Sequence, residues 1–102
     1  MSDKTLDEII QRILNKISAK KIILFGSRSR ADFKDDSDYD LLIICEDDID
    51  VKKISKELYA QFIGINKGID VIIRPQKYIK KSLKQVNSFI ASIIKEGKVV
   101  YE

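Results

Sequence analysis

Residues 21–45 of this 102-residue chain, KIILFGSRSRADFKDDSDYDLLIIC, contain two apolar segments joined by a polar connection. The first segment, residues 21–25, ends abruptly at Gly26 and Ser27, and the second occupies residues 39–45. Each segment has the length and composition of a buried β-strand. The stretch therefore predicts two strands of one sheet, with polar residues gathered where the first strand ends and the second begins.

Two aspartates, Asp38 and Asp40, stand one residue apart at the start of the second segment. Residues two apart on a strand point to the same face, so both carboxylates leave the sheet side by side. Two adjacent ionised carboxylates repel each other, and a bound cation offsets this repulsion and keeps both ionised. Mg²⁺ suits this role because it prefers hard oxygen ligands. Backbone amides at the strand-to-turn junction, Gly26 and Ser27, can hold an anion. Together these features predict a site for a metal-chelated nucleotide.

The composition limits the protein to one domain, residues 1–102, with a modest core. No apolar segment approaches the roughly 20 residues needed to span a bilayer, and the N-terminus lacks the apolar core of a signal peptide. We therefore expect a cytoplasmic protein without a membrane partner. The chain has no histidine, which excludes His-based catalysis and ordinary zinc sites, and its single cysteine, Cys45, is expected in the core.

Periodicity predicts helices between and after the strands. A capping box at Thr5 and Glu8 should open a helix that continues to about residue 18. The further expected elements are a helical turn at 28–31, a helix at 51–65 capped by Asp50 and ended by Asn66 or Gly68, a strand at 69–73, a helical turn after Pro75, a helix at 88–96 and an edge strand at 98–101.

The connection between the first two strands is too short for a parallel crossover with its helix, so these strands should be antiparallel. The fold class is then α/β (α+β), a small mixed sheet flanked by helices.

Charge is unevenly distributed along the chain. Residues 32–50 hold nine acids against Lys34, whereas residues 76–98 hold six lysines against Glu96. The acidic stretch suits metal binding, and the lysines suit an acidic partner, nucleic acid, or simply a solvated helix face.

The spacing of these residues resembles a known signature. Gly26-Ser27, ten intervening residues and then Asp38-Tyr39-Asp40 is similar to the pattern of the DNA polymerase β-type nucleotidyltransferase superfamily. The arginines of Gly26-Ser27-Arg28-Ser29-Arg30 resemble its small branch, the minimal nucleotidyltransferases. Asp70 matches the third carboxylate of that family, and Ala31 stands where the family usually has glycine.

The resemblance implies a mixed sheet flanked by helices and a Mg²⁺-dependent transfer of AMP from ATP to a hydroxyl. It implies that Asp38 and Asp40 hold two Mg²⁺ ions, while Asp70 completes the acceptor-side metal site and takes the acceptor proton. By the same resemblance, the β- and γ-phosphates are held by Gly26 and Ser27, and the leaving pyrophosphate is neutralised by Arg28 or Arg30.

Members of this branch are typically antitoxins that modify a tyrosine of a helical HEPN-domain ribonuclease toxin. The resemblance therefore implies a type VII-like antitoxin with a HEPN-type partner, and we do not expect direct nucleic-acid binding. Two alternatives remain open. One is a non-catalytic antitoxin that works by binding, and the other is an aminoglycoside-type nucleotidyltransferase with a separate substrate-binding subunit.

Some of these residues also have simpler structural interpretations. Asp70 could form an ion pair with Arg74 or Lys21, and Arg28 could be a solvated surface residue. Tyr39 lies between the two aspartates and should face the core. The stretch Lys77–Lys84, with Tyr78, Ile79 and Leu83, is the expected partner contact.

Overall fold

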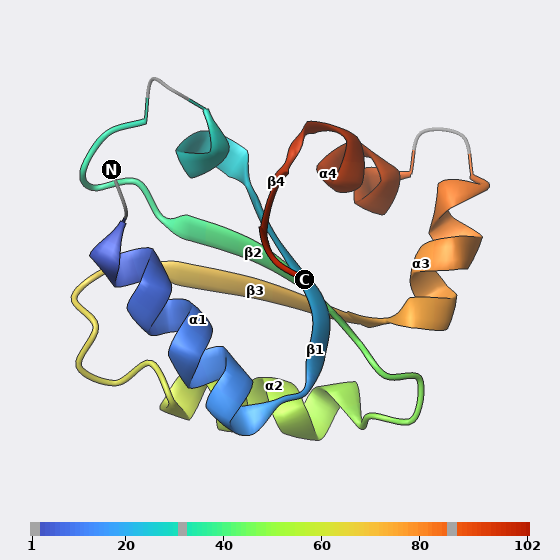
Figure 1. Cartoon of the computed structure of the whole chain (residues 1–102), viewed down its shortest axis with the longest axis horizontal. Coiled ribbons are helices and arrows are strands. Elements are labelled where there is room, and N and C mark those ends of the chain that lie inside the picture. Colours follow the sequence, from blue (N-terminus) through green and yellow to red (C-terminus); the bar gives the residue numbers. More distant parts are fainter. Residues whose placement is uncertain (1–2, 31–32, 86–87) are drawn as a thin grey trace.

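The computed structural model describes residues 3–30, 33–85 and 88–102, and within them four strands form one mixed sheet (Figure 1). The strands are β1 (Ala19–Phe25), β2 (Tyr39–Cys45), β3 (Ile69–Pro75) and β4 (Lys98–Tyr101), in the order β3-β2-β1-β4. β1 pairs antiparallel with β2 and β4, while β2 pairs parallel with β3. The mixed sheet, the antiparallel first pair and the edge position of β4 are confirmed.

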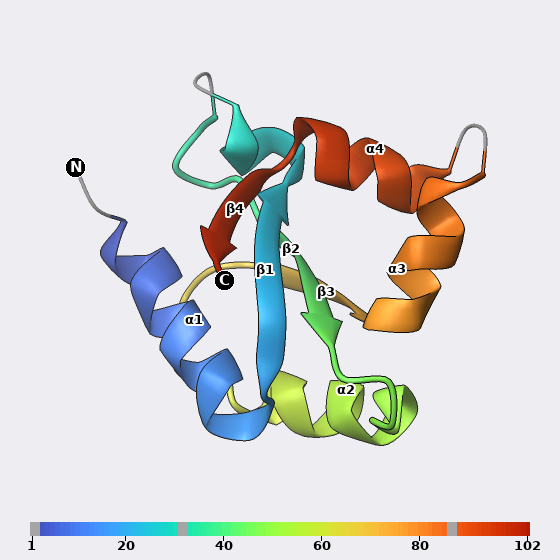
Figure 2. The ribbon, with the colours of Figure 1, turned by 45° about the vertical axis from the view of Figure 1, so that its right-hand side comes forward.

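Two pairs of helices cover the two faces of this sheet (Figure 2). The helices are α1 (Lys4–Lys16), α2 (Val51–Ala60), α3 (Gln76–Leu83) and α4 (Phe89–Glu96), and a short 3-10 helix, η1 (Gly26–Ser29), follows β1. Side chains of α1 and α2 pack on one face, and side chains of α3 and α4 pack on the other. None of the helices in the described ranges is both long enough and apolar enough to cross a membrane.

The helix termini differ in part from the sequence prediction. Asp3, and not Thr5, caps α1, because its carboxylate accepts a hydrogen bond of 3.0 Å from the Leu6 amide. Asp50 caps α2 as predicted, through the amide of Lys53 at 3.2 Å. α2 ends earlier than expected, and the glycine with a left-handed backbone beyond it is Gly64, with φ of +96°, instead of Gly68.

Further differences concern the two predicted turns. The turn after β1 is η1 at Gly26–Ser29, two residues before the predicted 28–31, and Ala31 lies outside the described residues. The turn expected after Pro75 is the longer α3, and Pro75 precedes its first residue.

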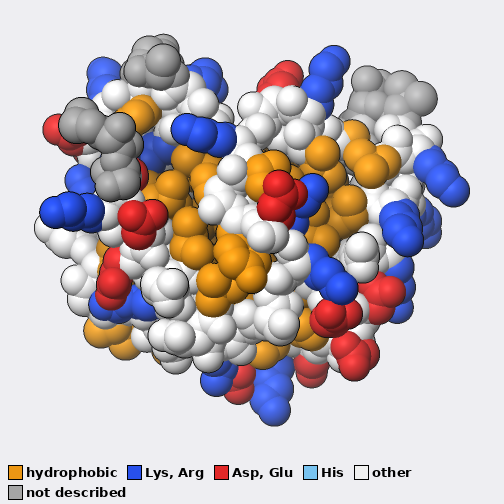
Figure 3. Space-filling model, in the orientation of Figure 1, with side chains coloured by type: hydrophobic (Ala, Val, Ile, Leu, Met, Phe, Trp, Pro, Cys, Tyr) orange, Lys and Arg blue, Asp and Glu red, His pale blue; other side chains and the backbone are white. Residues whose placement is uncertain are grey.

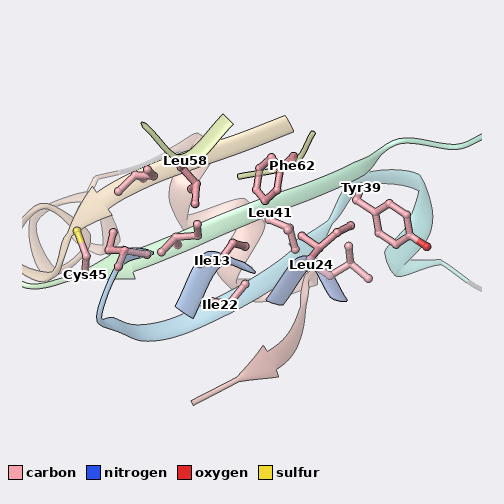
Figure 4. Close-up of a cluster of buried hydrophobic side chains, with 12 residues drawn as sticks. Ile13, Ile22, Leu24, Tyr39, Leu41, Cys45, Leu58 and Phe62 are labelled. Atoms are coloured by element: carbon pink, nitrogen blue, oxygen red, sulfur yellow. The ribbon is translucent and has the colours of Figure 1, made fainter. Parts of the chain in front are cut away.

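The larger part of the core lies between the sheet and α1 and α2 (Figure 4). Buried side chains from alternate positions of β1 and β2 meet side chains from both helices and from the loop after α2: Ile9, Ile13, Ile22, Leu24, Tyr39, Leu41, Ile43, Cys45, Leu58 and Phe62. A second cluster on the opposite face joins Ile23, Leu42 and Ile44 to Ile79, Ile90 and Ile93. β2 is therefore buried on both faces beyond Asp40, which explains its unbroken apolar sequence.

Candidate functional site

The turn after β1 lies directly against Asp40 of β2. Phe25, the last residue of β1, is opposite Asp40 in the antiparallel register. Gly26 has φ of +71°, a conformation that favours glycine, and a Cβ atom at this position would collide with Oδ2 of Asp40. Glycine therefore lets the turn close against the carboxylate in its present orientation.

The parallel pairing of β2 and β3 brings two carboxylates together. Asp40 is the register partner of Asp70, and Asp38 precedes Asp40 by two residues. Asp38 and Asp70 are exposed, whereas Asp40 is half-buried. Burial raises the pKa of the Asp40 carboxyl, and the negative charges of Asp70 and Asp38 raise it further. The structure thus places the three predicted acids close enough to repel each other.

The two cations that a structural role would pair with Asp70, Lys21 and Arg74, have other partners. Lys21 pairs with Glu102 at 3.7 Å, and the Arg74 guanidinium donates to the Ile73 carbonyl and lies over the Tyr78 ring. Neither therefore forms the ion pair with Asp70 that a purely structural role would require. The proposed site is a set of carboxylate oxygens in which neither of these two cations is paired with Asp70.

This donor set suits a hard divalent cation, since carboxylate oxygens are the ligands that Mg²⁺ prefers. Within the described residues, no group of three or more His, Cys, Asp or Glu side chains is already arranged to hold a metal ion. Binding by Asp38, Asp40 and Asp70 would therefore require their side chains to rotate toward one another. The chemistry of the donors fits the ion, while the metal-free rotamers do not form a finished cage.

Gly68 is a residue of the site that the sequence analysis assigned to another role. Its carbonyl accepts a hydrogen bond of 2.9 Å from the Tyr39 amide, and a Cβ atom on it would collide with Oδ1 of Asp38. In the sequence, the feature that could have indicated this role is the position of Gly68 directly before the strand that carries Asp70. Gly68 allows the connection into β3 to approach Asp38 closely.

Arg28 is buried, so the solvated-surface interpretation of it is wrong. Its side chain is 6% exposed, and Nε and Nη2 donate to the carbonyls of Ser37 and Asp35 at 2.7 and 2.8 Å. The guanidinium carbon lies 4.0 Å from the centre of the Tyr39 ring. Because Tyr39 packs on the α1 side of the sheet, as predicted, the guanidinium lies on the opposite side of β2 from Asp40.

Tyr39 is itself held by α1. Its hydroxyl donates to the Asp3 carboxylate at 2.8 Å. Burial, the hydrogen bond to Asp3 and the charge of Asp3 raise the pKa of Tyr39 to about 12. The hydroxyl therefore stays protonated at neutral pH and acts as a structural donor.

Arg30 lines a cavity of about 250 Å³ between the turn after β1 and α4, whereas Arg28 lines a different one, beside Asp3 and Tyr39. The Arg30 cavity is lined by Phe25, Gly26, Ser29, Arg30, Phe89, Ser92, Ile93, Glu96 and Gly97. In Figure 3 a notch at the top of the molecule lies between the turn after β1 and α4. Ser29 stabilises the turn, since its hydroxyl donates to the Gly26 carbonyl at 2.7 Å. Of the two predicted arginines, Arg30 is the one that lines this cavity together with Gly26.

Comparison with protein families gives one match that covers most of the chain. Residues 7–102 match the family described as "Polymerase beta, Nucleotidyltransferase". Two relatives from Methanocaldococcus jannaschii are named putative protein adenylyltransferase MJ1305 and putative protein adenylyltransferase MJ0604. The first is 32% identical, over 100% of this chain and 76% of the relative. The second is 31% identical, over 97% of each chain.

Solved structures show the same fold. A putative nucleotidyltransferase from Sulfolobus solfataricus has a TM-score of 0.63 at 20% identity, covering 97% of this chain and 78% of that one. A toxin-antitoxin crystallised with AMP-PNP has a TM-score of 0.62 at 18% identity, covering 93% of this chain and 71% of that one. At these identities the likeness is one of fold.

Proposed function

The chain belongs to the polymerase β nucleotidyltransferase family, and from that premise we propose that it transfers AMP from ATP to a hydroxyl of a partner protein. The acceptor is a tyrosine of a HEPN-type toxin, for which this cytoplasmic protein serves as the antitoxin. The names of the two archaeal relatives support protein adenylylation, and the fold shared with a toxin-antitoxin supports the type of partner.

One observation carries the proposal. Asp40 lies beside Asp70 on the neighbouring strand and directly against the Gly26 turn, so acidic groups and an anion-binding turn meet in one place. A structural carboxylate of this kind would need a cationic partner, and neither Lys21 nor Arg74 supplies one to Asp70. The arrangement suits a site that is completed by a nucleotide and its cation.

The reaction assigns a role to each acid. The acceptor oxygen attacks the α-phosphorus of ATP, an oxygen–phosphorus bond forms, the α–β phosphoanhydride bond breaks and pyrophosphate leaves. Asp70, which is exposed, accepts the proton lost by the acceptor hydroxyl. Asp38, Asp40 and Asp70 would hold two Mg²⁺ ions, which when bound neutralise phosphate charge and ease loss of the acceptor proton.

Binding of the triphosphate falls to the turn after β1. The backbone amides of Gly26 and Ser27 hold the β- and γ-phosphates, because a strand-to-turn junction leaves such donors available. Arg30, at the rim of the adjacent cavity, neutralises the leaving pyrophosphate. Arg28 takes no part in phosphate binding, since its guanidinium is engaged with backbone carbonyls on the other side of β2.

The partner meets the molecule beside α3. Lys and Arg side chains gather over α3 at the right of Figure 3, and Tyr78 and Leu83 are 45% and 52% exposed. Ile79, which was included in the predicted contact, is 7% exposed and packs in the core, so it is not available. An acidic partner surface would meet these lysines with an association rate that falls with salt.

The test is transfer of AMP to the protein encoded by the neighbouring gene, which we propose to be the toxin. The two proteins are incubated with Mg²⁺ and ATP, and the intact mass of the toxin is measured. We expect mass increments of AMP with the wild type, none with Asp38→Asn or Asp40→Asn, and unchanged increments with Asp48→Asn, an exposed acid outside the proposed site. A toxin that is bound and inhibited yet unmodified would contradict the proposal and favour the non-catalytic antitoxin.

A further inference from the structure

Arg28 contacts both chain neighbours of Asp38. Nε donates to the carbonyl of Ser37, which precedes Asp38, at 2.7 Å. The guanidinium carbon lies 4.0 Å from the ring centre of Tyr39, which follows Asp38. Within the described part of the chain these contacts of Arg28 are with the neighbours of Asp38 and not with its carboxylate, so Arg28 acts on Asp38 through the backbone.

Further contacts fix the guanidinium in place. Nη2 donates to the Asp35 carbonyl at 2.8 Å, and the Phe33 ring centre lies 4.9 Å from the guanidinium carbon. Nη1 lies 3.8 Å from the carboxylate of Asp3, which also accepts from the Tyr39 hydroxyl. Arg28 thus joins α1, η1 and the loop that leads into β2. The Lys67 ammonium donates to the same Asp35 carbonyl, at 2.6 Å.

Arg28 also lies two residues after Gly26, within η1. One side chain therefore connects the turn proposed to bind phosphate to the loop that presents Asp38. A planar guanidinium can donate to two carbonyls while stacking on an aromatic ring, whereas a lysine ammonium cannot reproduce that geometry. Burying such a charge is unfavourable unless its hydrogen bonds are satisfied, and here they are met by loop carbonyls.

We propose that Arg28 is a positioning residue that holds the 33–37 loop so that Asp38 stands beside Asp40 and the Gly26 turn. The inference rests on the proposed function, because it assigns Asp38 to the binding of Mg²⁺ with ATP. Loss of Arg28 should raise the Mg²⁺ concentration that ATP binding requires. The backbone amides of Gly26 and Ser27 should remain available to the phosphates. It should also loosen the loop, whether or not nucleotide is present.

The chain offers a matched control in Arg12. Its Nη1 donates to the carbonyls of Gln61 and Ile63, at 2.9 and 2.7 Å, so it also fastens a loop through two carbonyls. That loop follows α2 and does not carry a proposed ligand. Arg12→Met and Arg28→Met therefore remove comparable interactions at different places.

The first measurement is the Mg²⁺ concentration that gives half-maximal ATP binding. We expect Arg28→Met to raise it about tenfold, the lower end of what loss of an outer-shell partner produces at metal sites. Arg28→Lys should raise it less, and Arg12→Met should leave it unchanged. An equal rise in Arg12→Met would show that only general stability is involved. Weaker ATP binding by the Arg28 variants without Mg²⁺ would show direct phosphate contact. Either result overturns the inference.

The second measurement is amide hydrogen exchange of residues 33–38 in the protein without nucleotide. We expect faster exchange in Arg28→Met than in the wild type, and no change there in Arg12→Met. Unchanged exchange in Arg28→Met would overturn the inference. If the wild type itself shows no Mg²⁺-dependent ATP binding, the proposed function fails, and exchange still decides whether Arg28 holds the loop. Should Arg28→Met not fold, Arg28→Lys is used for both measurements.

Discussion

One face of β2 changes from acidic to apolar between Asp40 and Leu42. At one end it carries Asp38 and Asp40, and at the other Leu42 and Ile44, which α3 and α4 cover. Leu42 is completely buried, whereas Asp40 is half-buried beside two other acids. The same strand therefore serves packing at its covered end and presents charge at its acidic end.

The apolar end of β2 stabilises the fold, whereas the acidic end destabilises it. Apolar side chains at the covered end are removed from water against Ile79, Ile90 and Ile93. At the acidic end, burial and like charge disfavour ionised Asp40, as its raised pKa shows. An arrangement that disfavours ionised Asp40, and in which neither Lys21 nor Arg74 pairs with Asp70, favours a ligand-binding role over a structural one.

The largest expected effect lies at the covered end. Leu42→Ala should lower the free energy of unfolding by about 2–5 kcal/mol, since it leaves a cavity beneath α3 and α4. ATP binding per folded molecule should persist, because the acids are untouched. Urea unfolding and calorimetric titration measure the two quantities. Val99→Ala, at a 45% exposed position of β4, is the control and should change stability by no more than about 0.5 kcal/mol.

Leu42→Ala could instead remove ATP binding while the protein stays folded. That result would contradict the separation of packing at one end of β2 from binding at the other. It would mean that packing under α4 sets the position of the acids, and the two ends of the strand could not be treated separately.

The next effect concerns the turn that closes the acidic end. Gly26→Ala places a methyl group against Asp40, so AMP transfer should fall on the order of 100-fold, as small displacements of reacting groups can produce. Gly64 also has a positive φ, of +96°, but a Cβ atom there would meet nothing within 4 Å. Gly64→Ala should therefore show a similar backbone penalty, about 1–2 kcal/mol of stability, with normal transfer.

The two glycine variants are compared by denaturant unfolding and by the intact-mass assay. Equal losses of transfer in both would show that backbone strain alone, and not contact with Asp40, is responsible. Retained transfer in Gly26→Ala would mean that the turn and Asp40 do not act together.

The order of elements was predictable because it depends on local patterns. Apolar runs such as 39–45 are strand-length, and the short link between β1 and β2 excludes a parallel crossover, so the mixed sheet followed. The juxtaposition of Asp40 and Asp70 followed from the family resemblance; the parallel register of β2 and β3 then supplied its geometry. Asp50 was identified as a cap because it directly precedes the helical apolar pattern that begins at Val51.

What could not be predicted depends on contacts between distant residues. Thr5 and Asp3 are both good caps, and Asp3 is also the acceptor for the Tyr39 hydroxyl, 36 positions away. Arg28 is buried because Asp3, Tyr39 and the 33–37 loop meet around it, which no local pattern reveals. Gly68 looked like a helix end, while its role depends on the approach of Asp38.

The smallest expected effect is that of Asp70→Asn on the metal-free protein. Asp70 is exposed and has no ion pair with Lys21 or Arg74, so its charge contributes mainly repulsion toward Asp40. We expect the free energy of unfolding to stay the same or rise by up to about 0.5 kcal/mol. Added salt should shrink any rise by screening the charges.

Urea unfolding in the presence of a chelator measures this difference, and Asp50→Ala serves as the contrasting acid. Asp50 caps α2, so its removal should lower stability by about 1 kcal/mol. A loss of about 3–5 kcal/mol in Asp70→Asn, as expected when half of a buried ion pair is removed, would identify Asp70 as structural. Because transfer should nonetheless vanish in Asp70→Asn, a neutral effect on folding together with lost activity would place this carboxylate in the reaction and not in the framework.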